Sequence, residues 1–240
     1  MISHRSGNHL ISPTALHRSH MTEKITVLIT GPTGNAGSGV VRACLDHPGV
    51  GEVRVLTRRS LGKTHDKLVE VIHDDFLDYS AIEDGLTGLD ACFWCLGVSH
   101  YKVRRETDYH RITYEFTMEA AKVLERLNPG MTLCFLTGLG TDETQKSRMM
   151  WARIKGKAEA DLAKMDLDVY NFRPGFIHPI KGAKSSTILR SILYPFIKNS
   201  KKYCVEADEF GRAMINATLR GYDGHTLENR DIRILAATEP

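Results

Sequence analysis

Two hydrophobic patterns alternate along most of the chain: short β-branched apolar runs, and longer stretches whose apolar positions repeat every three or four residues. The first run ends at three glycines spaced G-x-x-G-x-x-G, and apolar residues at helical spacing follow directly. The alternation continues to residue 173 and predicts an α/β fold with a doubly wound parallel sheet. The predicted strands are residues 25–30, 52–57, 69–72, 89–96, 131–137 and 167–173, and the predicted helices are residues 35–45, 78–86, 105–127 and 149–162.

The alternation stops after the sixth predicted strand. Residues 176–180 leave the sheet, and residues 191–197 form an apolar segment interrupted by a proline, which we interpret as a lid. Contact of this segment with a membrane or a partner subunit is the alternative, because three lysines follow it. We predict a helix over residues 206–219 that packs back on the sheet and a short final strand at 232–235. Residues 176–240 are therefore assigned to a small C-terminal appendage, a substrate-side cover with closing elements.

The first residues of the chain show no periodicity. Residues 1–20 contain four of the eleven histidines, two arginines and no acid. They are too polar for a secretory signal and short of arginine for a transit peptide. We expect a disordered leader or tag-like tail over residues 1–22 and one folded domain over residues 23–240.

The composition is that of a soluble globular protein, with 42% hydrophobic and 25% charged residues and a net charge of +3. No apolar run approaches the ~20 residues needed to span a bilayer. Basic residues outnumber acidic residues only slightly, 32 to 29, and they are dispersed along the chain. We therefore expect neither a nucleic-acid partner nor a membrane partner.

Five cysteines are an odd number for a disulfide scaffold and favour a reducing compartment, so we predict a cytoplasmic protein. Cys92 and Cys95 have the spacing of a redox motif. However, residues three apart on a strand point to opposite faces of the sheet. We interpret both as core cysteines.

The glycine-rich turn after the first predicted strand is the main candidate for a binding site. Glycine lets the backbone take a positive φ and approach a ligand closely, and the following helix directs the positive end of its dipole at the turn. This arrangement suits the pyrophosphate of a nucleotide, whereas a glycine-rich turn without a ligand is the alternative. The candidate residues are Gly31, Thr33, Gly34, Asn35, Ala36 and Gly37.

Arg58 and Arg59 follow the second predicted strand, about 20 positions past the last glycine, where dinucleotide-binding folds place the adenosine ribose. An acid there would bind the 2′-hydroxyl of NAD. A guanidinium can instead bind a 2′-phosphate in a bidentate manner. We therefore predict NADP in preference to NAD.

Asp75 follows the third predicted strand and is the candidate for the adenine amino group, helped by the backbone of Phe76. A metal site at His73, Asp74 and Asp75 is the rival interpretation. Adjacent residues rarely converge on one ion, so we predict no metal.

Together these motifs resemble the short-chain dehydrogenase/reductase superfamily, in its atypical branch, over about residues 24–179. Within that branch the chain is similar to the NAD(P)-binding Tat-interacting-protein-like and nitrogen-regulator-like proteins. The resemblance implies a single Rossmann-like domain that holds NADP(H) at the carboxyl edge of its sheet. Besides the residues given above, it implies cofactor contacts at Leu96, Gly97, Lys155, Pro174 and Gly175.

The resemblance also implies a Tyr-x-x-x-Lys pair on the helix after the fifth strand. In that pair the lysine binds the nicotinamide ribose, and the tyrosine exchanges a proton with the substrate. Lys155 matches the lysine, but Trp151 stands at the position of the tyrosine. An indole N–H cannot act as an acid or base near neutral pH, so the catalytic pair is incomplete.

The hydroxyl that polarises the substrate in the family is also missing, because a glycine and a leucine occupy positions 138–139. Thr137 and Thr141 flank this gap and are candidate substitutes. Tyr101 and Tyr109 are candidates for a replacement phenol, although a tyrosine without chemistry is the alternative for each.

We therefore predict an NADP(H)-binding oxidoreductase that transfers a hydride on a carbonyl or alcohol, or performs related epimerase-type chemistry, on a small molecule. The catalytic candidates are Lys155, Trp151 and Thr137. The alternative, favoured by Trp151, is a non-catalytic NADP(H)-binding redox sensor or scaffold that acts through a protein partner. A homodimer is a candidate assembly.

Overall fold

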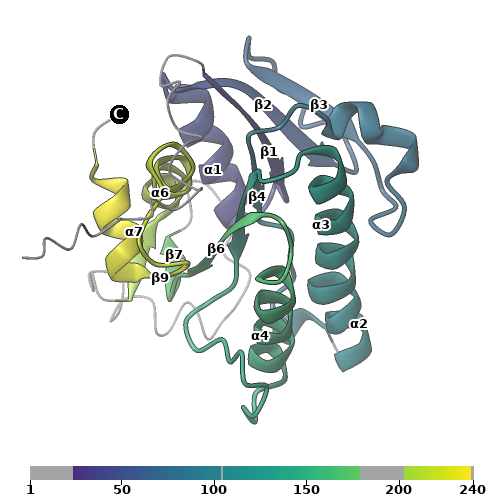
Figure 1. Cartoon of the computed structure of the whole chain (residues 1–240), viewed down its shortest axis with the longest axis vertical. Helices are drawn as coiled ribbons and strands as arrows, with labels where there is room; N and C mark the ends of the chain where they lie inside the picture. Colours follow the sequence, from purple (N-terminus) through teal and green to yellow (C-terminus); the bar gives the residue numbers. More distant parts are fainter. Residues whose placement is uncertain (1–23, 104, 179–202, 239–240) are drawn as a thin grey trace, which may run out of the picture.

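The computed structural model describes residues 24–103, 105–178 and 203–238, and its centre is a seven-stranded sheet (Figure 1). The strand order is β3-β2-β1-β4-β5-β6-β9, and every neighbouring pair is parallel. This arrangement confirms the predicted α/β fold with a doubly wound sheet. The strands are β1 (Ile25–Thr30), β2 (Val50–Thr57), β3 (Leu68–Ile72), β4 (Ala91–Trp94), β5 (Thr132–Leu136), β6 (Asp168–Arg173) and β9 (Thr226–Glu228).

Helices cover both faces of the sheet, which gives three layers (Figure 1). One face carries α1 (Asn35–Asp46), α6 (Ala207–Arg220) and α7 (Asn229–Ala236). The other face carries α3 (Phe116–Leu127), α4 (Met150–Leu162) and a 3₁₀ turn (Ser80–Leu86). The short helix α2 (Glu106–His110) runs through a π-helical turn (Arg111–Glu115) into α3, so the predicted helix over 105–127 is continuous but not uniform.

Successive side chains of the central strands enter two separate hydrophobic cores. In β1, Val27 and Ile29 lie in the core beneath α1 and α6, whereas Leu28 lies in the core beneath α3. Phe93 and Trp94 of β4 divide between the two cores in the same way. Strands buried on both faces read as continuous apolar runs, which is why the sequence pattern revealed them.

Small residues allow α6 to lie directly against α1. A Cβ atom on Gly39 would lie 2.4 Å from the Cβ of Ala207, and one on Gly211 would lie 2.6 Å from the Cβ of Ala43. No side chain larger than hydrogen fits at these two glycines without moving a helix. Helix α6 is thereby packed onto α1, the helix that follows the glycine turn.

One prediction for the C-terminal part is corrected by the structure. Residues 232–235 belong to helix α7, not to a strand, because Glu228 and Asp231 form a capping box that starts a helix. Ile232 is fully buried and Ile234 is 50% exposed, as one face of a helix requires. The final strand of the sheet is β9, which lies just before this helix.

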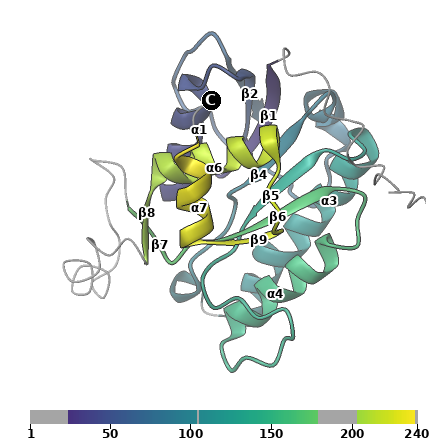
Figure 2. The same ribbon diagram turned by 60° about the vertical axis from the view of Figure 1, so that its left-hand side comes forward.

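A separate two-stranded sheet forms where the chain leaves β6. Strand β7 (Phe176–His178) pairs in parallel with β8 (Cys204–Glu206), so the first residues predicted to leave the sheet do so as a strand. Figure 2 shows this pair beside α6 and α7, away from the central sheet. The predicted leader over 1–22 and the predicted lid over 191–197 lie outside the described residues.

The five cysteines are free thiols. Cys92 lies in the core beneath α3, whereas Cys95 packs against the core on the other face, which confirms that they point to opposite sides. Burial raises the pKa of Cys92 well above its usual range and that of Cys95 to about 12. Both thiols are therefore protonated core groups. No helix within the described residues is long and apolar enough to cross a membrane.

Candidate functional site

The carboxyl ends of β1 and β4 define the candidate site. The chain leaves β1 through α1 to β2 on one side, and it reaches β4, the neighbour of β1 on the other side, only later. This reversal of strand order leaves a crevice outside the carboxyl ends, where ligands bind in open α/β sheets. The glycine turn at 31–37 follows β1, and Leu96 and Gly97 follow β4, so the structure brings both predicted segments to this point.

The glycine turn is fixed by close backbone contacts. Gly31 has a φ of 63°, and a Cβ on it would lie 2.8 Å from the carbonyl oxygen of Cys95. A Cβ on Gly37 would lie 2.1 Å from the carbonyl oxygen of Gly31, because α1 begins directly against the turn. The backbone N–H of Leu96 donates to Oγ1 of Thr30 at 3.0 Å and ties the exit of β4 to that of β1.

The first turn of α1 is free to bind an anion. Gly34 is the N-cap, and no side chain in the described part of the chain caps the helix, so the N–H groups of its first turn have no side-chain acceptor there. Thr33 is exposed beside them. The Nδ2 atom of Asn35 donates to the carbonyl of Ile177 at 2.9 Å, but its buried Oδ1 atom has no partner among the described residues.

These features fit a dinucleotide. Uncapped N–H groups at a helix N-terminus suit a pyrophosphate, and an orphaned acceptor such as Oδ1 of Asn35 suits a hydroxyl group of the same ligand. Ala36 is buried against the turn. Gly97 is exposed, and a Cβ on it would meet none of the described atoms within 4 Å. Packing within the described residues therefore does not require a glycine at this position.

Arg58 and Arg59 lie exposed directly after β2. No hydrogen bond or ion pair links either guanidinium to the described residues, so both are available to an anionic ligand. Asp75 is exposed after β3, and its Oδ1 accepts from the backbone N–H of Leu77 at 3.0 Å. The ring of Phe76 is buried and stacks on Phe116, which leaves its backbone for the predicted cofactor contact.

Lys155 on α4 reaches the end of β5. Its Nζ donates to the carbonyl oxygen of Thr137 at 2.6 Å. Burial lowers the pKa of Lys155 to about 8, partly offset by the nearby Glu159 carboxylate. Thr137 is 5% exposed and donates its hydroxyl to the carbonyl of Phe172 at 3.2 Å, while Thr141 donates to that of Gly138 at 2.7 Å. The structure thus brings Thr137 and Lys155 together through a carbonyl, with both threonine hydroxyls engaged in the protein.

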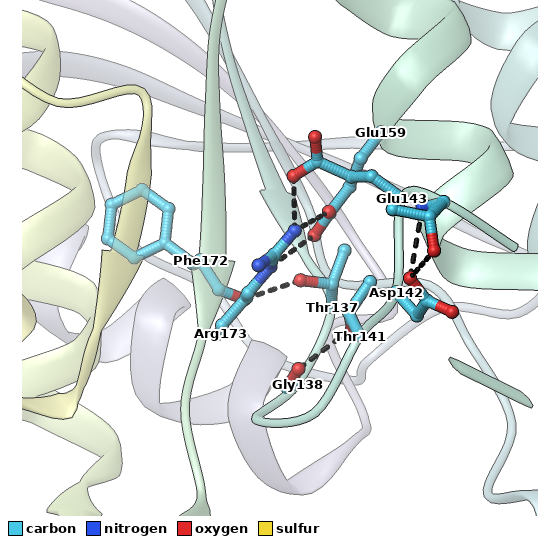
Figure 3. A network of polar contacts seen from close by, with 9 residues as sticks. Thr137, Gly138, Thr141, Asp142, Glu143, Glu159, Phe172 and Arg173 are labelled. Carbon is cyan, nitrogen blue, oxygen red and sulfur yellow. Dashed lines mark hydrogen bonds and ion pairs between the residues drawn. The ribbon is translucent and has the colours of Figure 1, made fainter. Parts of the chain in front are cut away.

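A network of charged side chains anchors α4 to the end of β6 (Figure 3). Arg173 donates from Nε to Oε1 of Glu159 at 3.1 Å, makes a second contact with the same carboxylate, and also pairs with Glu143. Glu159 is 1% exposed, so its charge is compensated by this guanidinium. Nothing local in the sequence indicates this network, because only the folded chain brings Glu143 near Arg173.

The loop that carries Glu143 is organised by its neighbour Asp142. The carboxylate of Asp142 accepts backbone N–H groups from Thr144, Lys146 and Ser147. Hydrogen bonds to the ionised form, led by the one from the Thr144 hydroxyl, hold the pKa of Asp142 below its usual range. A Cβ on Gly156 would lie 1.9 Å from the carbonyl oxygen of Asp142, so α4 packs directly on this loop.

Pro174 and Gly175 join neighbouring loops at the same edge of the sheet. The carbonyl of Pro174 accepts from the N–H of Leu139 at 3.0 Å. The N–H of Gly175 donates to Oδ1 of Asn229 at 3.0 Å, and a Cβ on Gly175 would lie 2.6 Å from the carbonyl oxygen of Tyr203. Both residues therefore shape the edge, and their contact with a cofactor stays a prediction.

Aromatic rings surround the position of the missing tyrosine. His100, in the loop after β4, stacks on Trp151 with 6.1 Å between ring centroids and 22° between planes. Tyr101 meets His100 edge-on at 5.6 Å and is 51% exposed. Tyr109 is 2% exposed and burial raises its pKa, so its candidacy as a replacement phenol is corrected. His100 was missed, because nothing local to it predicts a contact with a residue 51 positions later.

Comparison with known proteins agrees with this architecture. Residues 27–144 match the model of the NAD dependent epimerase/dehydratase family. The solved structure of UDP-N-acetylglucosamine 4-epimerase from Methanobrevibacter ruminantium M1, in complex with UDP-N-acetylmuramic acid, has a TM-score of 0.65 at 16% identity. It covers 86% of this chain and 76% of that chain. The Bordetella bronchiseptica enzyme WbmF, in complex with NAD⁺, has a TM-score of 0.65 at 14% identity, covering 89% and 77%.

Curated relatives come from fungi. Protein FMP52, mitochondrial, of Candida albicans is 22% identical over 220 residues, covering 83% of this chain and 90% of the relative. Protein fmp52-1, mitochondrial, of Aspergillus terreus is 22% identical over 212 residues, covering 83% and 89%. Because these relatives are named mitochondrial, the prediction of a cytoplasmic protein is wrong. Free thiols indicate a reducing environment but not which compartment provides it.

The matched family spans β1, the glycine turn, α1 and the crevice beside β4. It supports a nicotinamide cofactor and chemistry of the oxidoreductase or epimerase type. The solved neighbours share the three-layer fold with its parallel sheet. The chain is therefore a Rossmann-like protein, and its residues 27–144 are similar to the NAD dependent epimerase/dehydratase family.

Proposed function

We propose that the protein is an NADP(H)-dependent oxidoreductase that interconverts a carbonyl and an alcohol on a small molecule. The observation that carries the proposal is the glycine turn, whose backbone leaves the uncapped start of α1 open to a pyrophosphate. The family description and the NAD⁺ complex of the WbmF neighbour support a nicotinamide cofactor. The cofactor supplies the hydride.

Different residues at the crevice bind different parts of such a ligand. The first turn of α1 binds the pyrophosphate, and Asn35 offers an acceptor to a hydroxyl. Lys155, held by the carbonyl of Thr137, directs a cationic group to the carboxyl edge of the sheet. The ion pair between Arg173 and Glu159 anchors α4 to the end of β6 and so fixes the position of Lys155.

NADP is proposed over NAD because two exposed guanidiniums with no hydrogen-bond or ion-pair partner among the described residues lie at the end of β2. Measured with NADPH and NADH, wild-type protein should bind NADPH more tightly. Arg58→Ala should weaken NADPH binding by about 10- to 100-fold, the value of a lost charge-assisted hydrogen bond, and leave NADH unchanged. Arg126→Ala, an exposed arginine on α3 that pairs with Glu83, is the matched control. Equal NADPH affinity in wild type and Arg58→Ala would refute the assignment.

A second function is favoured by Trp151, whose indole cannot exchange a proton near neutral pH. In that case the protein binds NADP(H) as a sensor or scaffold and acts through a protein partner. NADPH absorbance followed across a panel of aldehydes, ketones and quinones separates the two functions. Tight binding with no oxidation of NADPH favours the sensor, whereas oxidation favours the enzyme.

The names of the curated relatives lead us to propose a mitochondrial location. Residues 1–20, which contain two arginines and no acid, are the segment to test. If this segment carries the signal although it is short of arginine, residues 1–23 fused to a fluorescent protein should direct it to mitochondria. If the full chain reaches mitochondria and the fusion does not, the signal lies elsewhere in the sequence.

A further inference from the structure

The loop after β4 places an imidazole against the residue that replaces the tyrosine. His100 stacks on the indole of Trp151, and Trp151 lies one turn before Lys155 on α4. The loop leaves the sheet next to the crevice between β1 and β4. His100 is therefore an exposed, titratable ring at the carboxyl edge of the sheet, beside the helix that carries Lys155.

Contacts of the neighbouring segments with Arg153 and Trp151 hold the region around His100 close to α4. Arg153 on α4 forms an ion pair with Glu106 at the start of α2, with 3.2 Å between Nη2 and Oε1. The same guanidinium donates from Nη1 to the carbonyl of Ser147 at 3.0 Å. Arg153 thereby joins the segment after His100 to the loop before α4. A Cβ on Gly140 would lie 3.5 Å from the indole, so that loop packs on the far part of Trp151.

Tyr109 and Cys95 keep their protons near neutral pH. Burial raises the pKa of Tyr109 and brings that of Cys95 to about 12. The ammonium of Lys155 is engaged by the carbonyl of Thr137. Imidazole is the side chain that ordinarily exchanges a proton between pH 5 and 8.

We propose that His100 is the proton donor and acceptor of this site. It exchanges the proton that the indole of Trp151 cannot exchange. The proposal rests on the proposed oxidoreductase function. In the reductive direction the carbonyl carbon gains a hydride from the dihydronicotinamide, and the carbonyl oxygen gains a proton from the imidazolium of His100. The carbonyl is reduced by two electrons and the nicotinamide is oxidised by two. The neutral imidazole then recovers its proton from water.

The first test locates His100 without requiring turnover. In NMR spectra the Cε1–H signal of His100, assigned by its loss in His100→Gln, should shift when NADP⁺ is added. It should stay in place when 2′,5′-ADP, which lacks the nicotinamide half, is added at saturation. The signal of His110, on α2 and hydrogen-bonded to Glu115, is the internal control and should move with neither ligand. Equal shifts of the His100 signal with both ligands, or with neither, would overturn the proposal.

The second test measures turnover of NADPH with 4-nitrobenzaldehyde and 9,10-phenanthrenequinone as probes. His100→Gln should lower kcat by about 100-fold or more, as expected for loss of a general acid. Its NADPH affinity should be unchanged, and because His100 is exposed, its thermal unfolding should match wild type. His110→Gln should keep wild-type turnover. Unchanged kcat in His100→Gln would refute the assignment, as would NADPH binding without turnover of either probe by wild type. Absence of NADPH binding would instead refute the proposed function.

Discussion

The two halves of the candidate site are built in different ways. On the β1 and β2 side, the backbone itself forms the site: a glycine with a φ of 63°, an uncapped helix start and carbonyls that leave no room for a Cβ. On the α4 side, side chains position one another, and Lys155, Glu159 and Arg173 come from separate turns or strands. The first half depends on local chain geometry, and the second depends on distant partners. Substitutions should therefore act through steric conflict in one half and through uncompensated charge in the other.

The largest effect is expected for Gly37→Ala. Its Cβ would overlap the carbonyl oxygen of Gly31, a backbone atom that cannot move without displacing the turn or α1. We expect a loss of about 4 kcal/mol in the free energy of unfolding, at the upper end of overpacking effects. Urea unfolding measures this loss.

Gly97→Ala is the matched control, since its Cβ would meet nothing within 4 Å. It should unfold within about 0.5 kcal/mol of wild type, as surface substitutions usually do. If both variants are equally stable, steric conflict does not define this half of the site.

On the α4 side, Glu159→Ala should destabilise the protein by about 3 kcal/mol, because it removes the buried partner of Arg173. This corresponds to a fall of about 10 °C in the temperature of thermal unfolding. Calorimetry measures it. Glu143→Ala, which removes the exposed partner of the same guanidinium, should cost less than about 1 kcal/mol. Equal losses in the two variants would contradict the role of burial.

The smallest effect is a dependence of stability on pH. Burial lowers the folded-state pKa of Lys155 to about 8, whereas the unfolded chain keeps the proton up to about 10.5. The unfolded state therefore binds more protons between these values, and stability rises with pH across that window. Relative to Lys155→Met, wild type should gain about 1–2 kcal/mol between pH 8 and pH 10, allowing for partial exposure of the side chain.

Chemical denaturation of wild type and Lys155→Met at pH 7, 8, 9 and 10 measures this difference. It should grow only slightly between pH 7 and pH 8 and more steeply above pH 8. A difference that stays flat up to pH 10 would show that Lys155 keeps its ordinary pKa in the folded protein.

The same contrast explains what could be predicted from sequence. The strand, turn and helix around Gly31 were found because their signals lie within neighbouring residues. Residues 232–235 were misread because four residues fit a strand and a helix equally well, and the capping box that decides between them begins at Glu228. The contact between His100 and Trp151 had no local signal, because it joins the loop after β4 to helix α4, which are distant in the sequence.

The close packing of α6 on α1 gives the cofactor half of the site a second function in the fold. Gly39 and Gly211 let the two helices meet without side chains between them. A ligand seated at the start of α1 would therefore stabilise a helix that begins more than 150 residues later in the chain. The paired strands β7 and β8 would be thermodynamically linked to cofactor binding through this helix pair, in addition to the hydrogen bond from Asn35 to the carbonyl of Ile177.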